Sequence, residues 1–148
     1  MEWREETLIP THIEVVWEVF QDKNSAKLDP SVTAHTLIEG KEDSIGAKHV
    51  QTYVEGKKKI TAVVETVLYK DEPNRKIKEI IYKEEHAFST KLRFELIKLN
   101  ENETQLIFEG NKEPVNLKGK LKMKFTARRE SDRSIQHVVQ CIRRAAGA

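Results

Sequence analysis

Apolar residues recur along the chain with two different periods. Near the N-terminus they follow the i, i+3, i+4, i+7 spacing of one helix face, at Ile13, Val16, Trp17 and Phe20. Thr11 precedes this run, and Glu14 lies three residues after Thr11, which is the spacing of a capping box. A helix is therefore predicted to begin at Thr11. One further helical turn is predicted over 25–28, before Asp29-Pro30, because the residue before a proline avoids the helical region.

From residue 32 onward the apolar period becomes two, which indicates strands. Strands are predicted over 2–9, 32–39, 47–54, 60–69, 76–83, 88–96 and 104–109. In 88–96 the even-numbered residues are apolar or threonine and the odd-numbered ones are polar, so the even-numbered ones are expected to face the core. In 60–69 both faces are nearly apolar, and the pattern leaves the buried face undecided.

A long helix is predicted from about residue 118 to 146, with Gly147 just past its end. On a helical wheel centred on Ile135, the buried stripe is apolar at Leu121, Ile135, Val138, Val139 and Ile142. Lys124, Arg128 and Ser131 fall on the same stripe. The middle of the helix is therefore expected to be polar where it faces the sheet.

The order of these elements predicts one α+β domain spanning residues 1–148. Consecutive strands joined by short turns form an antiparallel meander, and a meander with one apolar face needs a cover. Only the terminal helix is long enough to lie across it. A gap between a curved sheet and one helix is the natural place for a ligand.

This order resembles the START-like superfamily, also called SRPBCC, which includes the major birch pollen allergen and the bacterial polyketide cyclase/dehydrase-like proteins. The segments that carry the resemblance are 13–20 with Asp22, 29–32, the Glu39-Gly40 and Ile45-Gly46 pairs, and 128–146. It implies a helix-grip fold, in which a curved antiparallel sheet of about six to seven strands wraps around a long C-terminal helix, with two short helices after strand one.

The resemblance also implies a function, namely binding or carriage of a small hydrophobic or amphipathic ligand of the lipid, polyketide or aromatic acid type. One alternative is a cyclase-, dehydrase- or hydrolase-type enzyme acting on such a ligand. Another is an interaction protein that uses the basic face of the terminal helix. No catalytic motif is found, so an enzyme is the less favoured reading, and no cofactor is expected.

Ligand-binding side chains are expected on inward strand positions and in the middle of the terminal helix. They are Tyr69, Tyr82, Phe88, Leu92, Phe94, Phe108, Arg128, Ser131 and Ile135. Arg128 has the geometry to bind a ligand carboxylate or phosphate with two hydrogen bonds. The favoured alternative is that Arg128 pairs with a carboxylate of the sheet or reaches water.

The histidines match no metal-binding spacing, and no metal site is predicted. His35 and His49 lie on neighbouring predicted strands and could approach each other. His86 could act as a general base if it lined the cavity. The favoured interpretation is that His86 is a turn residue in an acidic cluster. Cys141 is expected to be a small buried hydrophobe, because no base is assigned near it.

Charge is distributed unevenly along the 148 residues. The net charge is +2, but residues 117–148 hold nine basic and two acidic residues, so the remainder is acidic. This asymmetry suits a nucleic-acid or anionic-membrane surface, or a solvated helix face that complements an acidic body. The last reading is favoured, and no nucleic acid is expected as a partner.

The remaining composition favours a cytoplasmic monomer. No apolar run approaches the roughly 20 residues that span a membrane, and the first residues are charged and unlike a secretory signal. A single cysteine cannot form an internal disulfide, which favours a reducing compartment.

Overall fold

The computed structural model describes residues 1–84, 87–125 and 128–147. Within them the elements follow in this order: β1 (Glu2–Ile9), α1 (Ile13–Val19), the 3₁₀ helix η1 (Asp22–Asn24), α2 (Ser25–Leu28), β2 (Val32–Glu39), β3 (Lys48–Glu55), β4 (Lys58–Asp71), β5 (Arg75–Glu84), β6 (Phe88–Asn100), β7 (Glu103–Pro114), α3 (Leu117–Phe125) and α4 (Arg128–Ala145). No helix in these ranges is long and apolar enough to cross a membrane.

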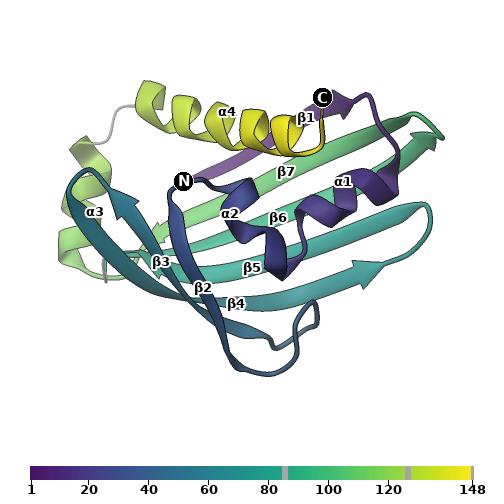
Figure 1. Ribbon diagram of the computed structural model, residues 1–148. Coiled ribbons are helices and arrows are strands. Elements are labelled where there is room, and N and C mark those ends of the chain that lie inside the picture. Colours follow the sequence, from purple (N-terminus) through teal and green to yellow (C-terminus); the bar gives the residue numbers. More distant parts are fainter. Residues whose placement is uncertain (85–86, 126–127, 148) are drawn as a thin grey trace.

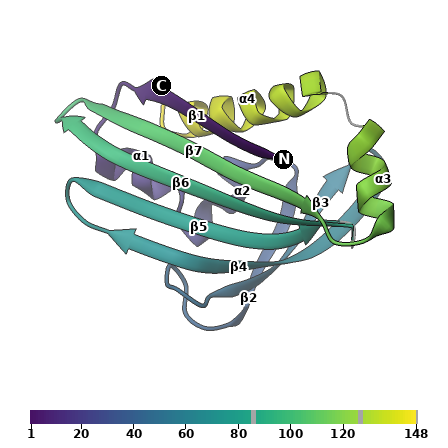
Figure 2. The same cartoon turned by 180° about the vertical axis from the view of Figure 1, so that it is seen from behind.

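The seven strands pair antiparallel in one sheet, in the order β1-β7-β6-β5-β4-β3-β2. Strands β2 to β7 form a meander, and β1 lies at the opposite edge beside β7. The segment α1-η1-α2 therefore carries the chain from one edge of the sheet to the other (Figure 1). Figures 1 and 2 show that α1, α2 and α4 lie on the hollow side of the curved sheet and that α3 lies at one end. The predicted α+β helix-grip architecture is confirmed.

The even-numbered residues of β6 face the helices, as the alternating pattern predicted. The ring centroid of Phe94 lies 4.9 Å from that of Phe20, which is at the end of α1. Phe88, Thr90 and Leu96 are buried on the same side of the strand. This face is apolar, so burying it contributes about 25 cal/mol per Å² of area removed from water.

Strand β4, whose buried face the sequence did not decide, changes face along its length. Val64 pairs with Tyr82, which places the even-numbered residues up to Thr66 on the inner face. The register then shifts directly after Thr66. Beyond this irregularity Tyr69 is the residue that turns inward, and its ring lies 5.2 Å from that of Trp17. A bulge of this kind explains why no single alternation describes the strand.

Aromatic side chains fill the interior at the end of the sheet that carries α1. Phe94 stacks on Phe108 with centroids 5.0 Å apart, and Trp3 meets Phe108 edge-on at 6.0 Å. Helix α4 adds the predicted apolar stripe, buried at Ile135, Val139 and Ile142, and Ala146 is buried directly after the helix. Offset and edge-on contacts are the geometries that aromatic rings favour, so this end of the molecule is a packed core.

The prediction of one long C-terminal helix is wrong. Helices α3 and α4 are separate and run in different directions (Figure 1). Leu121 and Lys124, which were expected on the stripe of the long helix, belong to α3 and are exposed. A helical wheel assumes one straight axis, so the predicted stripe holds only within α4.

The predicted capping box is also wrong. The N-cap of α1 is His12, whose Nδ1 accepts a hydrogen bond of 3.0 Å from the backbone N–H of Glu14. A ring nitrogen thus satisfies one of the free N–H groups of the first turn, a role usually taken by a side-chain oxygen. The start of the helix was predicted within one residue.

The outer face of the sheet carries a ladder of ion pairs across β5 and β6. Arg93 donates to Glu79 at 2.6 Å and to Glu95 at 3.2 Å, and Arg75 donates to Glu95 at 2.9 Å. The hydrogen bond from Arg75 holds the pKa of Glu95 below its ordinary value, although partial burial acts in the opposite direction. Glu95 therefore stays ionised although neighbouring residues cover most of its side chain.

Candidate functional site

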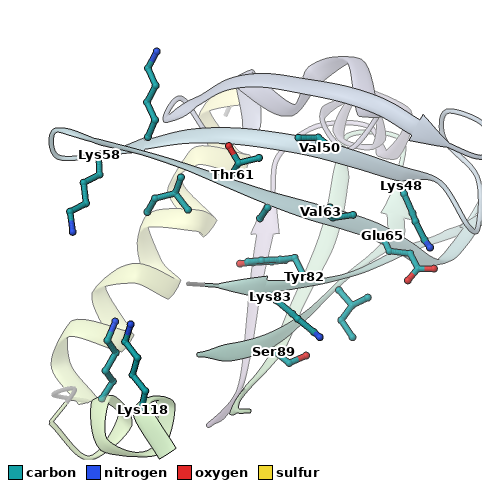
Figure 3. Close-up of a pocket in the computed structure, with 15 residues that line it drawn as sticks. Lys48, Val50, Lys58, Thr61, Val63, Glu65, Tyr82, Lys83, Ser89 and Lys118 are labelled. Carbon is teal, nitrogen blue, oxygen red and sulfur yellow. The ribbon is translucent and has the colours of Figure 1, made fainter. Parts of the chain in front are cut away.

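A pocket of about 910 Å³ lies at the end of the sheet that carries α3. Its walls are the β3–β4 hairpin, the ends of β5 and β6, and helix α3 (Figure 3). The lining residues are Lys48, Val50, Lys58, Lys59, Ile60, Thr61, Ala62, Val63, Glu65, Ile81, Tyr82, Lys83, Ser89, Lys118 and Lys122. A pocket of this size lies within the range that holds a small organic molecule.

The pocket forms where β4 extends beyond its pairing with β5. Strand β4 begins at Lys58, but the pairing described between β4 and β5 begins at Val64 and Tyr82. Residues 58–63 pair with β3 in the hairpin. Because the pocket lies around this edge of β4, residues from both faces of the strand line it.

Positive charge dominates the described part of the lining, which contains six lysines and one carboxylate, that of Glu65. Figure 3 shows Lys58 reaching from the hairpin and Lys118 reaching from α3 toward the same opening. Lys48 pairs with Glu39 at 2.9 Å outside the pocket, and this hydrogen bond raises its pKa. Like charges converging on one opening raise the local potential, which attracts an anion.

Apolar side chains form the rest of the wall. Val50 and Val63 pair across β3 and β4 on the outer face, and Ile60 and Ala62 lie on the inner face. Tyr82 projects from β5 toward the opening (Figure 3). The combination of an apolar wall with a basic rim suits a molecule that has an apolar body and an acidic group.

Helix α3 forms one wall because its first turn lies against the loop before β6. A Cβ atom at Gly119 would lie less than 3.0 Å from the carbonyl oxygen of Ala87, so only glycine allows this approach. The same carbonyl accepts a hydrogen bond of 2.9 Å from the backbone N–H of Val115. The backbone N–H of Gly119 donates to Asn116 Oδ1 at 2.9 Å, which satisfies a group of the first turn.

The predicted ligand-binding residues are not all gathered in one place. Tyr82 lines the pocket. The residues that lie in the packed core or against it are Tyr69, Leu92, Phe94, Phe108 and Ile135. Phe88 is buried, with Lys112 Nζ 4.4 Å from its ring centroid. The side chains of Arg128 and Ser131 lie outside the part of the chain that is described. Ligand contact by these residues stays a prediction.

The lysines that line the pocket were not predicted from the sequence. They come from four separate elements, β3, β4, β5 and α3, and meet only through the pairing of β3 with β4 and the position of α3. The run Lys57-Lys58-Lys59, at the turn of the hairpin and the start of β4, was the one sign in the sequence of a basic surface there. The sequence of the hairpin alone could not show that the lysines of α3 lie across the pocket from it.

His35 and His49 do meet, on the inner face of β2 and β3. Their rings stack with centroids 4.1 Å apart and planes inclined by 17°. His49 Nε2 lies 3.0 Å from Glu42 Oε1 and 3.6 Å from Asp22 Oδ2. His35 Nδ1 lies 2.9 Å from Gln51 Oε1. The result is a polar cluster within the folded interior, apart from the lysine-lined pocket.

Asp22 connects this cluster to the rest of the fold. Lys78 Nζ donates to Asp22 Oδ1 at 2.9 Å and to the carbonyl oxygen of Phe20 at 2.5 Å. The backbone N–H of Asp43 donates to Asp22 Oδ2 at 2.7 Å. Burial by itself raises the pKa of Asp22, but Lys78 and the Asp43 N–H together bring it below its ordinary value. Burial lowers the pKa of His35, and the neighbouring His49 acts in the same direction.

His12, Tyr69 and Cys141 are not among the residues that line the pocket. His12 caps α1, and His86 is outside the described residues. Cys141 is buried on α4, with its Sγ 3.6 Å from His137 Nε2. Tyr69 contacts Trp17, and burial, followed by the charges of Asp43 and Asp71, raises its pKa to about 12.

Solved structures with the same architecture span nearly the whole chain. A conserved protein from Geobacillus kaustophilus is 14% identical, with a TM-score of 0.72, over 99% of this chain and 92% of that one. Major latex-like protein 151 from Panax ginseng is 15% identical, with a TM-score of 0.68, over 97% and 95%. Norcoclaurine synthase from Thalictrum flavum, solved with dopamine and hydroxybenzaldehyde, is 12% identical, with a TM-score of 0.66, over 97% and 84%.

No protein-family model and no curated protein matches the sequence. Identities of this size show the fold alone. The structural similarity therefore confirms the resemblance to START-like proteins as a resemblance of fold.

Proposed function

We propose that this protein binds a small amphipathic molecule bearing a carboxylate or phosphate group, in the pocket between the β3–β4 hairpin and α3. The observation that carries the proposal is the lining itself, in which six lysines and an apolar wall surround about 910 Å³. An acidic group offsets the mutual repulsion of the lysines, and the apolar wall takes the body of the molecule. Lipid, polyketide and aromatic acids all have this chemistry.

Binding is the function that the lining residues support better than catalysis. The titratable groups described there are lysines, Glu65 and Tyr82. This set recognises an anion but contains no pair of carboxylates or histidines to exchange a proton. The neighbour solved with dopamine and hydroxybenzaldehyde indicates that the fold accommodates small aromatic molecules. Arg128, at the start of α4, is proposed as a further contact to the acidic group.

The test compares an anionic naphthalene sulfonate dye with a neutral naphthylamine dye of similar size. The variant Lys58→Gln/Lys118→Gln removes two lining charges from opposite walls. The matched control is Lys57→Gln/Lys120→Gln, whose residues are exposed neighbours on the same elements and do not line the pocket. Both variants lower the net charge equally.

The lining variant is expected to bind the anionic dye about 2- to 30-fold more weakly, because it loses two partly exposed ion pairs that contribute about 0.2–1 kcal/mol each. The neutral dye should bind both variants alike. Equal loss of anionic binding in the lining variant and in the control would mean that net charge, and not the pocket, attracts the dye.

Native mass spectrometry of the freshly purified protein then identifies any ligand retained from its host.

A second function, docking on an anionic membrane surface, is favoured by the outer side of α3. Leu117 and Leu121 lie four residues apart on one side of the helix and are 71% and 50% exposed. Lysines flank this apolar stripe on both sides, at Lys118, Lys120, Lys122 and Lys124. Exposed leucines beside lysines offer the apolar and the cationic contacts that an anionic membrane surface accepts.

Vesicle sedimentation tests this second proposal. Wild-type protein should bind vesicles containing phosphatidylserine and not vesicles of phosphatidylcholine alone. Leu117→Ser/Leu121→Ser should abolish this binding, and Leu8→Ser/Leu99→Ser, at exposed leucines of the strands, should not. Binding to duplex DNA that survives the Leu117→Ser/Leu121→Ser change would instead indicate a purely electrostatic surface.

A further inference from the structure

The cluster formed by Asp22, His35 and His49 has a property that the rest of the described interior lacks. Each of the three offers one ligand atom, and these atoms lie within 4.8 Å of one another. Asp22 and His49 are buried, and His35 is partly buried. The three residues come from η1, β2 and β3, so the fold and not the local sequence brings them together.

One nitrogen of the cluster is left unused. His35 Nε2 is buried and has no hydrogen-bond partner, whereas His35 Nδ1 faces Gln51 Oε1 at 2.9 Å. Because an amide oxygen only accepts, the proton of the neutral ring lies on Nδ1, and Nε2 carries a free lone pair. A buried acceptor without a partner destabilises a fold unless something binds to it.

Metal-binding histidines have this arrangement. The ring nitrogen that does not bind the metal usually donates to a fixed oxygen, which sets the tautomer and the ring orientation. Gln51 supplies such an oxygen for His35. The N–H of Asp43 and the ammonium of Lys78 hold the carboxylate of Asp22 in the same way.

Glu42 lies beside this group, against His49. Its two carboxylate oxygens lie 3.0 and 3.1 Å from His49 Nε2, and its side chain is 48% exposed. Two carboxylates and one ammonium give the cluster a net negative charge, which favours a dication. Two imidazoles with carboxylate oxygens form a donor set that suits zinc and similar transition metals.

We propose that Asp22, His35 and His49 form a binding site for a divalent transition-metal ion such as Zn²⁺, with the carboxylate of Glu42 beside it. The site is independent of the lysine-lined pocket. Metal–ligand bonds of about 2.0–2.2 Å place neighbouring tetrahedral ligands roughly 3.4 Å apart, so the ligand atoms must draw together. The stacked rings must also tilt, since a metal lies in the plane of each imidazole that binds it. Occupation would tie η1 to β2 and β3.

The test is calorimetric titration of untagged, chelator-treated protein with Zn²⁺, and with Mg²⁺ as a control ion. One Zn²⁺ per chain is expected, together with a rise in the melting temperature. His35→Gln should weaken binding at least 100-fold, and Gln51→Ala, which removes only the oxygen facing His35, about 10-fold. The Gln51→Ala variant keeps all three ligands, so it remains informative if His35→Gln fails to fold.

A competing pair controls for adventitious metal. His137 and Cys141 lie one helical turn apart on α4, with Nε2 and Sγ at 3.6 Å. Binding that is lost in His137→Gln and retained in His35→Gln would overturn the proposal, as would the absence of Zn²⁺ binding to the folded protein. The absorption spectrum of Co²⁺-loaded protein separates the two sites, because only a thiolate ligand gives an intense near-ultraviolet charge-transfer band.

Discussion

Replacing Gly110 with alanine should destabilise the protein by about 0.5–4 kcal/mol, through the clash of one methyl group with Trp3. Gly110 of β7 pairs with Trp3 of β1, and the indole ring lies directly over it. A Cβ atom at Gly110 would lie less than 3.0 Å from three atoms of that ring. The backbone of Gly110 is not in the left-handed region, so the clash and not backbone strain is the cause.

The magnitude is the sum of three effects. Inserting a methyl group into a packed site costs about 1–3 kcal/mol. Displacing Trp3 also weakens its edge-on contact with Phe108, at 6.0 Å and 74°, which is worth about 0.5–1.5 kcal/mol. Alanine restores about 0.5–1 kcal/mol, because glycine loses more backbone entropy on folding. Since Trp3 Nε1 makes no hydrogen bond in the described structure, packing alone holds the ring in place.

Urea denaturation followed by circular dichroism measures the loss of stability. The double variant Trp3→Leu/Gly110→Ala should be no less stable than Trp3→Leu alone, since the methyl group then meets a side chain that can move. In a Trp17→Phe background Trp3 is the one remaining tryptophan, and its emission should shift to the red when Gly110→Ala displaces it. An unchanged urea midpoint together with unchanged emission would refute the reasoning.

Three further predictions follow from described contacts. The pKa of Glu95 is depressed, so its stabilising effect is present above its unfolded pKa of about 4.5 and is lost as pH falls through the folded value. Glu95→Gln should therefore remove that part of the acid dependence of the urea midpoint. A variant with the same pH profile as the wild type would contradict this prediction. Tyr69 should ionise near pH 12, so the unfolding free energy should fall between about pH 10 and 12, and Tyr69→Phe should remove the step near pH 12 from the tyrosinate absorbance titration. Gly119→Ala should push α3 away from Ala87 and weaken binding of the anionic dye, despite its higher helix propensity; unchanged affinity would show that the position of α3 does not shape the pocket.

The alternating patterns predicted the elements well, because one face of most of them is buried. The buried residues include Phe88, Thr90, Phe94 and Leu96 of β6 and Ile135, Val139 and Ile142 of α4, as the patterns predicted. The pattern failed where both faces are apolar. In β4 only the pairing of Val64 with Tyr82 decides which side turns inward, and the sequence of β4 does not contain that information.

The candidate sites depend on register and helix direction, which the sequence did not reveal. His35 pairs with Gln51, next to the pair formed by Leu37 and His49, and this register brings the two histidines into contact. A slip of one residue would place one ring on the outer face. The lysines of α3 line the pocket because α3 and α4 are separate helices, whereas one straight helix would have carried them elsewhere.

The position of β1 beside β7 has a consequence for how the protein folds. Glu2 pairs with Asn111 and Ile9 pairs with Thr104, so during synthesis the first strand of the sheet waits for its last strand. Until then β1, with Trp3 and Ile9 on one side, has no partner strand. Contacts between such distant parts of the chain give a high contact order, and proteins of this kind fold more slowly than helical bundles. The sheet is therefore completed only after synthesis has passed β7, and a chain truncated before that strand should expose an unpaired edge prone to aggregation.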